Sequence, residues 1–323
     1  MGLNLWRGVL SVDLSGSNSQ EVCMLQVKDE MRNGRVYNGT TSMFGITVNG
    51  VHYLVKKAKG SSLSVFSEYI ASKFMCELGI PCQKVELGIY NGAYVSVIKD
   101  LTLGGALTLH SFADTQQSSE DTDLSAKEYT YTDVQYLLTQ HTKLTPERKK
   151  EALIRFWDMF IIDAILANMD RHSGNWGYLS DGLSMRLAPV YDNNACLFPS
   201  VSQMMHLYAS AETRRGFLWE RVYKFPASMF KMKRSDETRK TNFAEMFADL
   251  RVSKDFAVRV KYYRASYTAA RIFSTIQGIA ATLPLSAEYK RFYIEIVTLR
   301  YMCIVLRVDF NVAYAEVERW LSV

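Results

Sequence analysis

Residues 156–196 have the sequence FWDMFIIDAILANMDRHSGNWGYLSDGLSMRLAPVYDNNAC. The stretch begins as a strongly apolar helix and becomes a polar loop that contains Asp170. Two short strands then flank the dipeptide Asp181-Gly182, which is typical of a type I′ hairpin turn. Asp192 follows the second strand. This order predicts that side chains from the loop and from the end of the hairpin share one site.

The hairpin determines which side chains meet. At about 3.3 Å per residue, the predicted strands 176–179 and 184–188 run roughly 13 Å out and a similar distance back. Asn175, which enters the hairpin, therefore lies beside segment 189–192, which leaves it. One carboxylate from the loop, one from the segment after the hairpin and the amide of Asn175 are expected to converge.

Such a cluster of oxygen ligands, with one carboxylate left to orient a hydroxyl, suits Mg²⁺-dependent phosphoryl transfer. The spacing from Asp170 to Asn175 is also the D-x-x-x-x-N spacing of the protein-kinase catalytic loop. An ordinary Asp-rich turn is the better interpretation of either element taken alone, because Asp and Asn favour turns for conformational reasons. The prediction therefore depends on the two elements occurring together.

The composition is that of an ordinary soluble globular protein. The chain has 323 residues, 48% of them apolar and 22% charged, with a net charge of +5 that permits anionic ligands such as nucleotides. No apolar run reaches the about 18 to 20 residues of a membrane span, and residues 1–14 lack the pattern of a signal peptide. Five scattered cysteines favour a reduced cytoplasm, and five dispersed histidines give zinc little support.

Residues 1–100 are predicted to form a β-rich lobe that contains one helix. Asn49-Gly50 and Asn91-Gly92 are strong hairpin signals. Residues 64–78 have helical periodicity and are followed by Gly79, a natural C-terminal stop. The predicted strands are 21–28, 44–49, 51–57, 84–90 and 93–98. From residue 44 onward, the order strand, strand, helix, strand, strand is that of a kinase small lobe.

This order places Lys56 at the end of the strand before the helix and Glu68 in the first half of the helix. A lysine there can contact the α- and β-phosphates of a nucleotide while the helix glutamate holds it in place. A solvated strand end and a favourable charge near a helix N-terminus are the structural alternatives. Lys57 remains a rival to Lys56, because strand alternation alone does not say which neighbour points inward.

Two further segments of this lobe are candidates for nucleotide contacts. The loop Gly39-Thr40-Thr41-Ser42 joins two predicted strands and is rich in small residues, so its backbone N–H groups are candidates to cover phosphates. A bland surface loop is an equally good interpretation. The residues Lys99, Asp100 and Leu101 are predicted to begin the linker between the lobes.

Residues 101–323 are predicted to form a second, larger lobe, which is mainly helical beyond Pro199. Residues 113–128, rich in Ser, Thr, Gln and Asp, are expected to form a mobile surface loop. On the helix that begins at Thr145-Pro146, Asp163 is expected to be structural and to pair with loop backbone or with an arginine. Helical spacing of apolar residues also predicts helices over 132–140 and within 289–321.

The region between Arg214 and Arg271 is basic, with fifteen Lys or Arg residues and six Asp or Glu residues. A solvated helical face is the default interpretation, and binding to nucleic acid or to an acidic partner is the sharper alternative. No known nucleic-acid-binding motif accompanies the cluster, so direct binding to nucleic acid is not expected.

Two motifs carry a resemblance to a known family. Residues 168–175 read NMDRHSGN and match N-x-D-R-H-x-x-N, and residues 188–192 read APVYD and match A-P-x-Y/F-D. In these motifs the chain resembles the HipA-like serine/threonine kinases, and it is most similar to the short, CtkA-like members. The likeness extends weakly over 36–195 and includes YLVK at 53–56 and SEY at 67–69.

The resemblance implies an α+β, bilobal protein-kinase-like fold related to lipid kinases, with a β-rich N-lobe and a mainly helical C-lobe. It also implies ATP and Mg²⁺ as cofactors. Asp170 resembles the catalytic aspartate that orients the substrate hydroxyl, and Asn175 and Asp192 resemble the Mg²⁺ ligands. The implied ATP-binding residues are Lys56, Glu68, Gly39, Thr40, Thr41, Ser42, Lys99, Asp100, Leu101, His172, Asn175 and Tyr191. For His172, a hydrogen bond that shapes the loop is an equally good role.

The chain departs from the family pattern in two places. Full-length HipA toxins carry an additional N-terminal subdomain for which there is little room here, and docking to a DNA-binding antitoxin is expected to be lost with it. The loop at 39–42 also stands where many members have a glycine-rich segment with an autophosphorylated serine. Phosphorylation of Thr40, Thr41 or Ser42 in cis is therefore a hypothesis.

The predicted function is transfer of the γ-phosphate of ATP to Ser or Thr hydroxyls of a protein substrate, including the chain itself. A phosphoinositide or small-molecule kinase is one alternative. A catalytically inactive nucleotide-binding module that contacts an antitoxin or another acidic partner is the other. The expected location is the cytoplasm, and the sequence does not say whether the protein is delivered into another cell.

Overall fold

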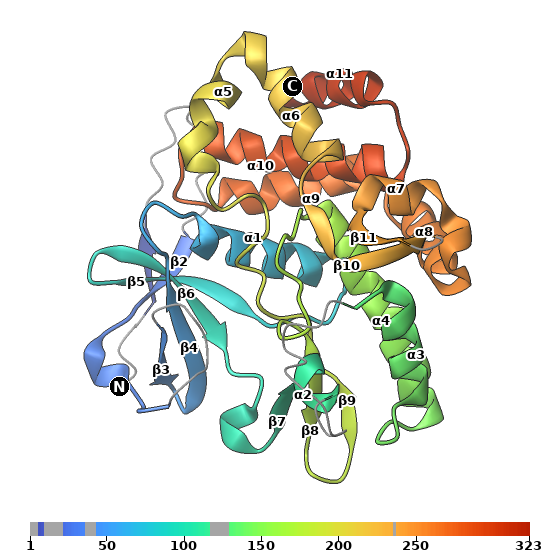
Figure 1. Ribbon diagram of the computed structural model, residues 1–323. Coiled ribbons are helices and arrows are strands. Elements are labelled where there is room, and N and C mark those ends of the chain that lie inside the picture. Colours follow the sequence, from blue (N-terminus) through green and yellow to red (C-terminus); the bar gives the residue numbers. More distant parts are fainter. Residues whose placement is uncertain (1–5, 10–21, 36–42, 117–128, 235–236) are drawn as a thin grey trace.

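The computed structural model describes residues 6–9, 22–35, 43–116, 129–234 and 237–323. A β-rich N-lobe lies beside a larger, mainly helical C-lobe, as Figure 1 shows. The α+β fold with these two lobes is the predicted one. Among the described residues, none of the helices combines the length and the apolar character needed to cross a membrane.

The N-lobe is built on one six-stranded sheet with the strand order β1-β2-β5-β6-β4-β3. All neighbouring strands are antiparallel except β2 and β5, which are parallel. Both predicted Asn-Gly hairpins are confirmed: φ is 50° and 76° at Asn49 and Gly50, and 49° and 76° at Asn91 and Gly92. Two successive positive φ angles are what a type I′ turn requires. The strands are β1 Trp6–Val9, β2 Val22–Gln26, β3 Met43–Val48, β4 Val51–Lys57, β5 Val85–Tyr90 and β6 Ala93–Lys99.

Helix α1, Ser64–Glu77, is the helix predicted for the N-lobe, and ten of its fourteen residues are buried. It contacts β5 and β6 on one side and the C-lobe helix α9 on the other. The helix ends where Gly79 adopts a φ of 70°, and Ile80 donates a backbone hydrogen bond back to Met75 at 2.9 Å. A glycine in this left-handed conformation is a common helix stop. Because α1 is covered on two sides, it belongs to the cores of both lobes.

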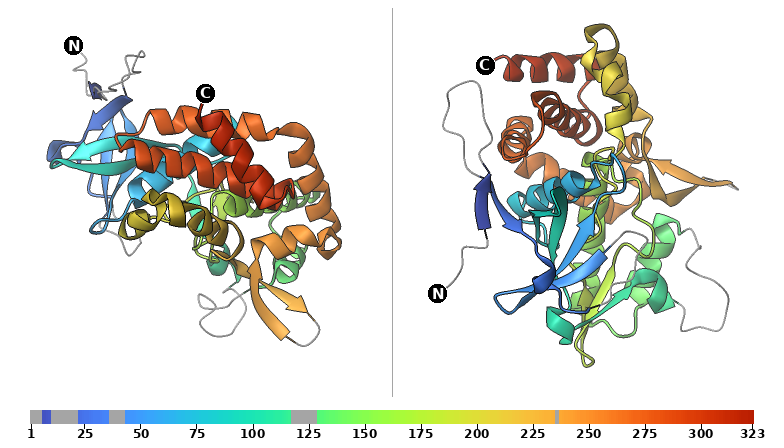
Figure 2. Two further views of the ribbon diagram at one scale, coloured as in Figure 1. Left: turned by 90° about the horizontal axis from the view of Figure 1, so that it is seen from above. Right: turned by 90° about the vertical axis from the view of Figure 1, so that its left-hand side faces the viewer.

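The C-lobe is organised around α4, Pro146–Ile165, which begins as predicted. The Thr145 side chain accepts a hydrogen bond from the Arg148 N–H, and Pro146 occupies the first turn. The second half of α4 is almost entirely buried, and α9 and α10 run side by side beyond it (Figure 2). The other helices are α2 Phe112–Gln116, α3 Tyr131–Gln140, α5 Met205–Ala209, α6 Ala211–Tyr223, α7 Phe243–Ala248, α8 Lys254–Ser266, α9 Ala269–Ala281, α10 Ala287–Arg300 and α11 Phe310–Leu321.

In the part of the chain that the structure describes, the helical structure also includes short 3₁₀ turns and a π-helical turn. The 3₁₀ turns are η1 Asp29–Met31, η2 Leu103–Gly105, η4 Val201–Met204 and η5 Leu250–Val252, and the π-helical turn is η6 Tyr301–Val305. The predicted helical segment 289–321 is therefore helical but broken. Arg307 there has a φ of 64°, and Asp309 caps the start of α11 by accepting hydrogen bonds from two backbone N–H groups.

A three-stranded sheet, β7-β8-β9, lies at the bottom of the molecule in Figure 1 and corrects one prediction. The predicted hairpin is present, but the type I′ turn is wrong: the strands are joined by residues 181–184, of which only Gly182 has a positive φ. The carboxylate of Asp181 accepts hydrogen bonds from the N–H groups of Leu183 and Ser184, and this side-chain turn replaces the predicted one. The strands are β7 Thr108–Ser111, β8 Gly177–Ser180 and β9 Met185–Leu187.

Two other stretches differ from prediction. Residues 113–116 of the predicted mobile loop belong to helix α2, and the rest of that loop, 117–128, lies outside the described residues. In the region predicted as mainly helical, β10 Ala227–Arg234 and β11 Glu237–Asn242 form a hairpin. Apolar residues are too sparse in the second half of this hairpin for either a helical or a strand period to be read.

Candidate active site

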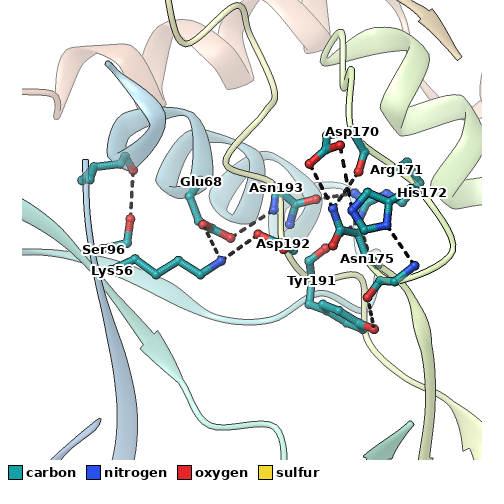
Figure 3. Close-up of polar contacts among 12 residues, drawn as sticks. Lys56, Glu68, Ser96, Asp170, Arg171, His172, Asn175, Tyr191, Asp192 and Asn193 are labelled. Atoms are coloured by element: carbon teal, nitrogen blue, oxygen red, sulfur yellow. Dashed lines mark hydrogen bonds and ion pairs between the residues drawn. The ribbon is translucent and has the colours of Figure 1, made fainter. Parts of the chain in front are cut away.

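Lys56 lies between two carboxylates that come from different lobes. Its Nζ is 2.7 Å from Oδ1 of Asp192 and 3.3 Å from Oε2 of Glu68, as Figure 3 shows. Strand β4 delivers the lysine, α1 delivers the glutamate, and the segment after β9 delivers the aspartate. The structure thus brings together three predicted site residues that are up to 136 positions apart in sequence.

Lys57, the rival for this position, points elsewhere. Its Nζ lies 4.4 Å from the ring centroid of Tyr90 and 5.7 Å from that of Phe44. These are cation–π contacts on the other face of the sheet, because successive residues of a strand point to opposite faces. The register of β4 therefore directs Lys56, and not Lys57, towards Asp192.

The electrostatics of the cluster favour a charged Lys56. Burial lowers the pKa of its amino group, but the charges of Glu68 and Asp192 and the hydrogen bonds to them outweigh burial, so the pKa is raised above 10.5. For Glu68 burial is the largest effect and raises the pKa of the carboxyl above 4.5, although Lys56 opposes it. Glu68 is 1% exposed, so its charge has little access to water and depends on these partners.

Glu68 also anchors the segment after Asp192. Its Oε1 accepts a hydrogen bond from the backbone N–H of Asn193 at 3.0 Å, while its Oε2 faces Lys56. Asp192 itself has a φ of 54°, a left-handed conformation that Asp tolerates better than most residues. One buried carboxylate therefore fixes both the lysine and the backbone next to Asp192.

The loop after α4 holds Asp170 and Asn175 together. The side-chain N–H₂ of Asn175 donates to the backbone oxygen of Asp170 at 2.7 Å and to its Oδ2 at 3.3 Å. The backbone N–H of Asp170 donates to Oδ1 of Asn168 at 3.0 Å, which shapes the start of the loop. The Asp170 side chain is 50% exposed, so its carboxylate is accessible to a ligand.

Arg171, for which no role was predicted, joins this loop to the segment after the hairpin. The arginine is 2% exposed and pairs with Asp163 of α4, Nε to Oδ2 at 3.0 Å and Nη2 to Oδ1 at 3.1 Å. Its Nη1 donates to the backbone oxygens of Asn175 at 2.8 Å and Tyr191 at 2.5 Å. The expectation that Asp163 pairs with an arginine is confirmed, and the open end of the hairpin is closed as predicted.

Arg171 makes one more contact, to the side chain of Asn193, whose Oδ1 lies 2.6 Å from Nη2. Asn193 was also missed, although it directly follows the A-P-x-Y-D motif. An arginine next to the loop aspartate and an amide next to the hairpin aspartate were the available signals. Neither signal shows by itself that the two side chains meet.

His172 shapes the loop in this structure. Its Nδ1 accepts a hydrogen bond from the backbone N–H of Gly174 at 3.0 Å. Its Nε2 is 3.9 Å from Oδ1 of Asp170, which is too long for a hydrogen bond. Of the two roles open to His172, the structure shows the loop-shaping one.

The predicted hinge residues differ in which backbone groups they leave available. Lys99 donates its N–H to Lys84 and accepts from the Gln83 side chain, and Asp100 donates its N–H to His52. The backbone N–H and C=O of Leu101 have no hydrogen-bond partner among the described residues. The Leu101 side chain packs against a small apolar cluster of Leu179, Ala188 and Tyr191. Leu101 therefore has a backbone N–H and C=O without partners among the described residues, and an apolar cluster beside them.

Of the remaining residues predicted to bind nucleotide, the structure describes Tyr191 but not the loop 39–42. The hydroxyl of Tyr191 lies 3.4 Å from the backbone oxygen of Gly174, across the mouth of the loop. Gly39, Thr40, Thr41 and Ser42 lie outside the described residues.

The donor atoms of the site fit a magnesium ion. Asp192 engages Oδ1 with Lys56 and Asn175 engages its N–H₂ with Asp170, so Oδ2 of Asp192 and Oδ1 of Asn175 accept no hydrogen bond from the described residues. No group of three or more His, Cys, Asp and Glu side chains in the described ranges is arranged to hold a metal. Mg²⁺ is usually bound by only one or two carboxylates, with phosphate oxygens and water completing its coordination.

The basic region 214–271 has several internal partners and a separate cavity. Arg259 pairs with the buried Asp158 at 2.6 Å, and Arg264 donates to the backbone oxygen of Val305 at 2.7 Å. A cavity of about 850 Å³ is lined by residues of α7, η5 and α8 together with Arg307, and contains none of the predicted site residues. Part of the basic charge is therefore structural.

Comparison with known proteins gives a matching family model and a related kinase. A family model described as HipA-like C-terminal domain matches residues 25–255. The serine/threonine-protein kinase CtkA of Helicobacter pylori is 32% identical over 180 residues, which are 55% of this chain and 53% of CtkA. The aligned part thus spans about half the length of this curated relative.

Solved structures show the same architecture. The crystal structure of the Helicobacter pylori proinflammatory kinase CtkA superposes with a TM-score of 0.71 and 26% identity, covering 87% of this chain and 95% of that chain. HipA of Shewanella oneidensis MR-1, solved with HipB and operator DNA, gives a TM-score of 0.52 and 13% identity over 90% of this chain and 70% of that chain. The second likeness shows the fold alone.

Proposed function

Because the chain belongs to the HipA-like C-terminal domain family, we propose that it is an ATP- and Mg²⁺-dependent serine/threonine protein kinase. The observation that carries the proposal is the position of Lys56 Nζ between Glu68 and Asp192, 2.7 Å from the aspartate. A lysine held in this way is suited to bind phosphate oxygens next to a metal-binding carboxylate. Its relative CtkA, named a serine/threonine kinase, supports the choice of acceptor.

In this proposal Lys56 binds the phosphates of ATP and Glu68 keeps its amino group in place. Leu101 offers its free backbone N–H and C=O to adenine, above the apolar cluster of Leu179, Ala188 and Tyr191. Asn175 and Asp192 would hold Mg²⁺, which supplies positive charge to the phosphates when bound. Each of these roles uses an atom that has no hydrogen-bond partner among the described residues, or an atom that would exchange its present partner for the ligand.

Asp170 acts on the acceptor. Its exposed carboxylate accepts a hydrogen bond from the Ser or Thr hydroxyl, so the hydroxyl oxygen is aimed at the γ-phosphorus. As the oxygen forms its bond to phosphorus, the bond from the γ-phosphorus to the β,γ-bridging oxygen breaks, and the hydroxyl proton passes to Asp170. The products are a phosphorylated side chain and ADP. Asn175 and Arg171 keep the loop that carries Asp170 in one conformation.

We also propose that the chain phosphorylates itself, with Thr40, Thr41 and Ser42 as candidate acceptors. Their place in the sequence, directly before β3, which pairs with the strand that carries Lys56, motivates the proposal. Phosphopeptide mapping after incubation with ATP tests it. Phosphate on at least one of these residues is expected in the wild type and not in Asp170→Asn. A phosphate-free peptide from an active preparation would remove the proposal while leaving the kinase assignment intact.

The experiment that tests the function measures transfer of labelled phosphate from ATP to a general protein substrate. Asp170→Asn and Asp192→Asn are each expected to reduce transfer by about 10²-fold or more. Asp181→Asn, which changes an exposed carboxylate in the β8–β9 turn, is the matched control and should retain activity. Circular dichroism melts verify folding. Wild-type rates in both site variants would refute the assignment.

The same assay separates this function from the other kinase classes. Phosphoinositide vesicles and small amino or hydroxyl compounds are offered in parallel with protein. Transfer to protein alone, or transfer to protein far faster than to the other acceptors, is expected. Transfer to lipid or to a small molecule with none to protein would overturn the proposed acceptor but keep the phosphotransfer chemistry.

A further inference from the structure

Cys76 and Cys82 form a close thiol pair at the end of α1. Their sulfur atoms are 3.4 Å apart, and neither cysteine is in a disulfide. Cys76 is exposed, whereas Cys82 is half-buried and its thiol lies 3.4 Å from the backbone oxygen of Ser72. The other two described cysteines whose burial is known, Cys196 and Cys303, are buried.

The helix stop explains why the two sulfurs meet. Gly79 turns the chain with a φ of 70°, and hydrogen bonds from Gly79 to Cys76 and from Ile80 to Met75 tighten the turn. Pro81 cannot continue the helix, so the chain returns along α1 and places Cys82 beside Cys76. The proximity of the thiols is thus built into regular, hydrogen-bonded backbone.

We propose that Cys76 and Cys82 are an oxidative modification site, at which hydrogen peroxide converts the two thiols into a reversible disulfide. The sulfurs need to approach from 3.4 Å to about 2.05 Å. The proposal is independent of the proposed kinase function, because it concerns only these two side chains.

The two cysteines are suited to different steps of this reaction. The exposed Cys76 reaches the oxidant first: its thiolate attacks one peroxide oxygen, the O–O bond breaks, and a sulfenic acid and hydroxide form. The hydroxide takes up the proton that Cys76 lost, giving water. Cys82 then attacks the sulfur of Cys76, the S–O bond breaks, and a second water leaves with the Cys82 proton. Two thiols are oxidised and one peroxide is reduced to two waters.

The surroundings of Cys82 fit the second step. Burial and the neighbouring Cys76 raise the pKa of the Cys82 thiol to about 12, so it is a poor first target for an oxidant in solution. Its fixed position beside Cys76 compensates, because a held partner reacts far faster than a free one. The exposed Cys76 is therefore expected to react first, and the shielded Cys82 second.

The disulfide would connect two elements of the candidate active site. Cys76 lies on α1, the helix of Glu68, and Cys82 forms a parallel bridge with Val190, two residues before Asp192. Backbone hydrogen bonds from Gln83 to Val190 at 2.8 Å and from Val190 to Pro81 at 2.9 Å hold this bridge. The hydrogen bond between Glu68 and Asn193 already joins α1 to the segment around Asp192, and oxidation would add a covalent bond to this set of contacts.

Mass spectrometry of the full chain tests the proposal. Trypsin releases both cysteines in one peptide, residues 74–84, FMCELGIPCQK. After treatment with hydrogen peroxide and alkylation, this peptide is expected to be unalkylated and lighter by two hydrogen atoms than the dithiol. Dithiothreitol should restore two alkylation sites. The peptides of the buried Cys196 and Cys303 are expected to stay in the thiol form.

Single variants decide the order of events. In Cys82→Ser, a cyclic diketone probe is expected to trap sulfenic acid at Cys76, whereas in Cys76→Ser the remaining Cys82 should stay a thiol. Oxidation should raise the melting temperature of the wild type by several degrees and leave both variants unchanged. Two alkylated sulfurs in the wild type, at a peroxide concentration that gives sulfenic acid in Cys82→Ser, would overturn the proposal.

Discussion

The guanidinium of Arg171 and the carboxylate of Asp163 form a two-point ion pair, at 3.0 and 3.1 Å, that is buried between α4 and the loop after it. The remaining donors of Arg171 reach the backbone on both sides of the β8–β9 hairpin. One arginine therefore connects the residue before the hairpin to the residue before Asp192. The spacing between the two halves of the site depends on this side chain.

Replacing Arg171 is expected to disrupt both stability and activity. Arg171→Met leaves Asp163 buried without its charged partner, and losing one partner of a buried pair typically costs about 3 to 5 kcal/mol. Phosphate transfer should fall with it. Denaturant unfolding is the measurement, and Arg148→Met, which removes an exposed ion pair with Glu151, is the control with an expected change below about 0.5 kcal/mol. Equal losses in the two variants would contradict this role.

Lys56 and Lys57 provide a matched pair of adjacent residues. Lys56→Met is expected to lower phosphate transfer by about 10²-fold or more, because the charge proposed to bind the phosphates of ATP is removed. Lys57→Met removes cation–π contacts with Phe44 and Tyr90, worth about 0.5 to 2 kcal/mol at this half-buried position, so its rate should stay close to wild type. Initial rates with labelled ATP measure both. The reverse order of activities would exclude Lys56 as the phosphate lysine.

Glu68 is expected to make activity and stability respond to pH in opposite directions. Burial raises the pKa of its carboxyl above 4.5, so the folded protein binds this proton more tightly than the unfolded chain does. The stability from this group is fully present below the unfolded pKa and is lost as pH rises through the folded pKa. Glu68 attracts the Lys56 amino group strongly only while its carboxyl is ionised. The kcat/KM for ATP should therefore fall as pH drops through the same window.

The control for this prediction is Glu68→Gln, in which no proton is exchanged at that position. Rates and melting temperatures are compared between about pH 8 and pH 5. The wild type should gain stability relative to Glu68→Gln as pH falls while losing its rate advantage over the variant. Parallel curves for the two proteins in both measurements would show that Glu68 is not the group responsible.

Gly177, the first residue of β8, is expected to tolerate no side chain. A Cβ there would lie 2.1 Å from the backbone oxygen of His110 and 2.8 Å from the backbone nitrogen of Phe112. Backbone atoms cannot move away as a flexible side chain does, so Gly177→Ala should destabilise the fold and displace Asn175. Gly216 of α6 meets no atom within 4 Å, and Gly216→Ala should stabilise the protein by about 0.5 to 1 kcal/mol. Denaturant midpoints for the pair measure both effects.

Local signals predicted much of the fold correctly. The Asn-Gly dipeptides at 49–50 and 91–92 form type I′ turns because both residues accept a positive φ, and Thr145 caps α4 because its side chain can accept a backbone N–H. These effects act within a few residues of sequence. They also set the register of β4 against β3, but they left Lys56 and Lys57 as alternatives, because alternation along a strand does not say which neighbour faces the site.

The errors and omissions have two physical causes. At Asp181-Gly182 a side chain competed with the backbone: Asp181 accepts two N–H groups and replaces the predicted turn. Arg171 and Asn193 lie 22 positions apart, and their contact depends on how the hairpin packs on α4. Sequence spacing could show that the ends of the hairpin meet, but not which side chain would join them.

The burial of α1 has a consequence for regulation. Tyr267 donates from its hydroxyl to the Leu78 backbone at 2.8 Å, and the hydroxyls of Tyr69 and Thr282 are 3.4 Å apart, so C-lobe residues hold both the body and the end of this helix. A helix fixed against the sheet and the other lobe at once cannot swing outward without opening the shared core. The Lys56–Glu68 pair is therefore assembled when the chain folds, and an on–off control of this protein has to act elsewhere than on the angle of α1.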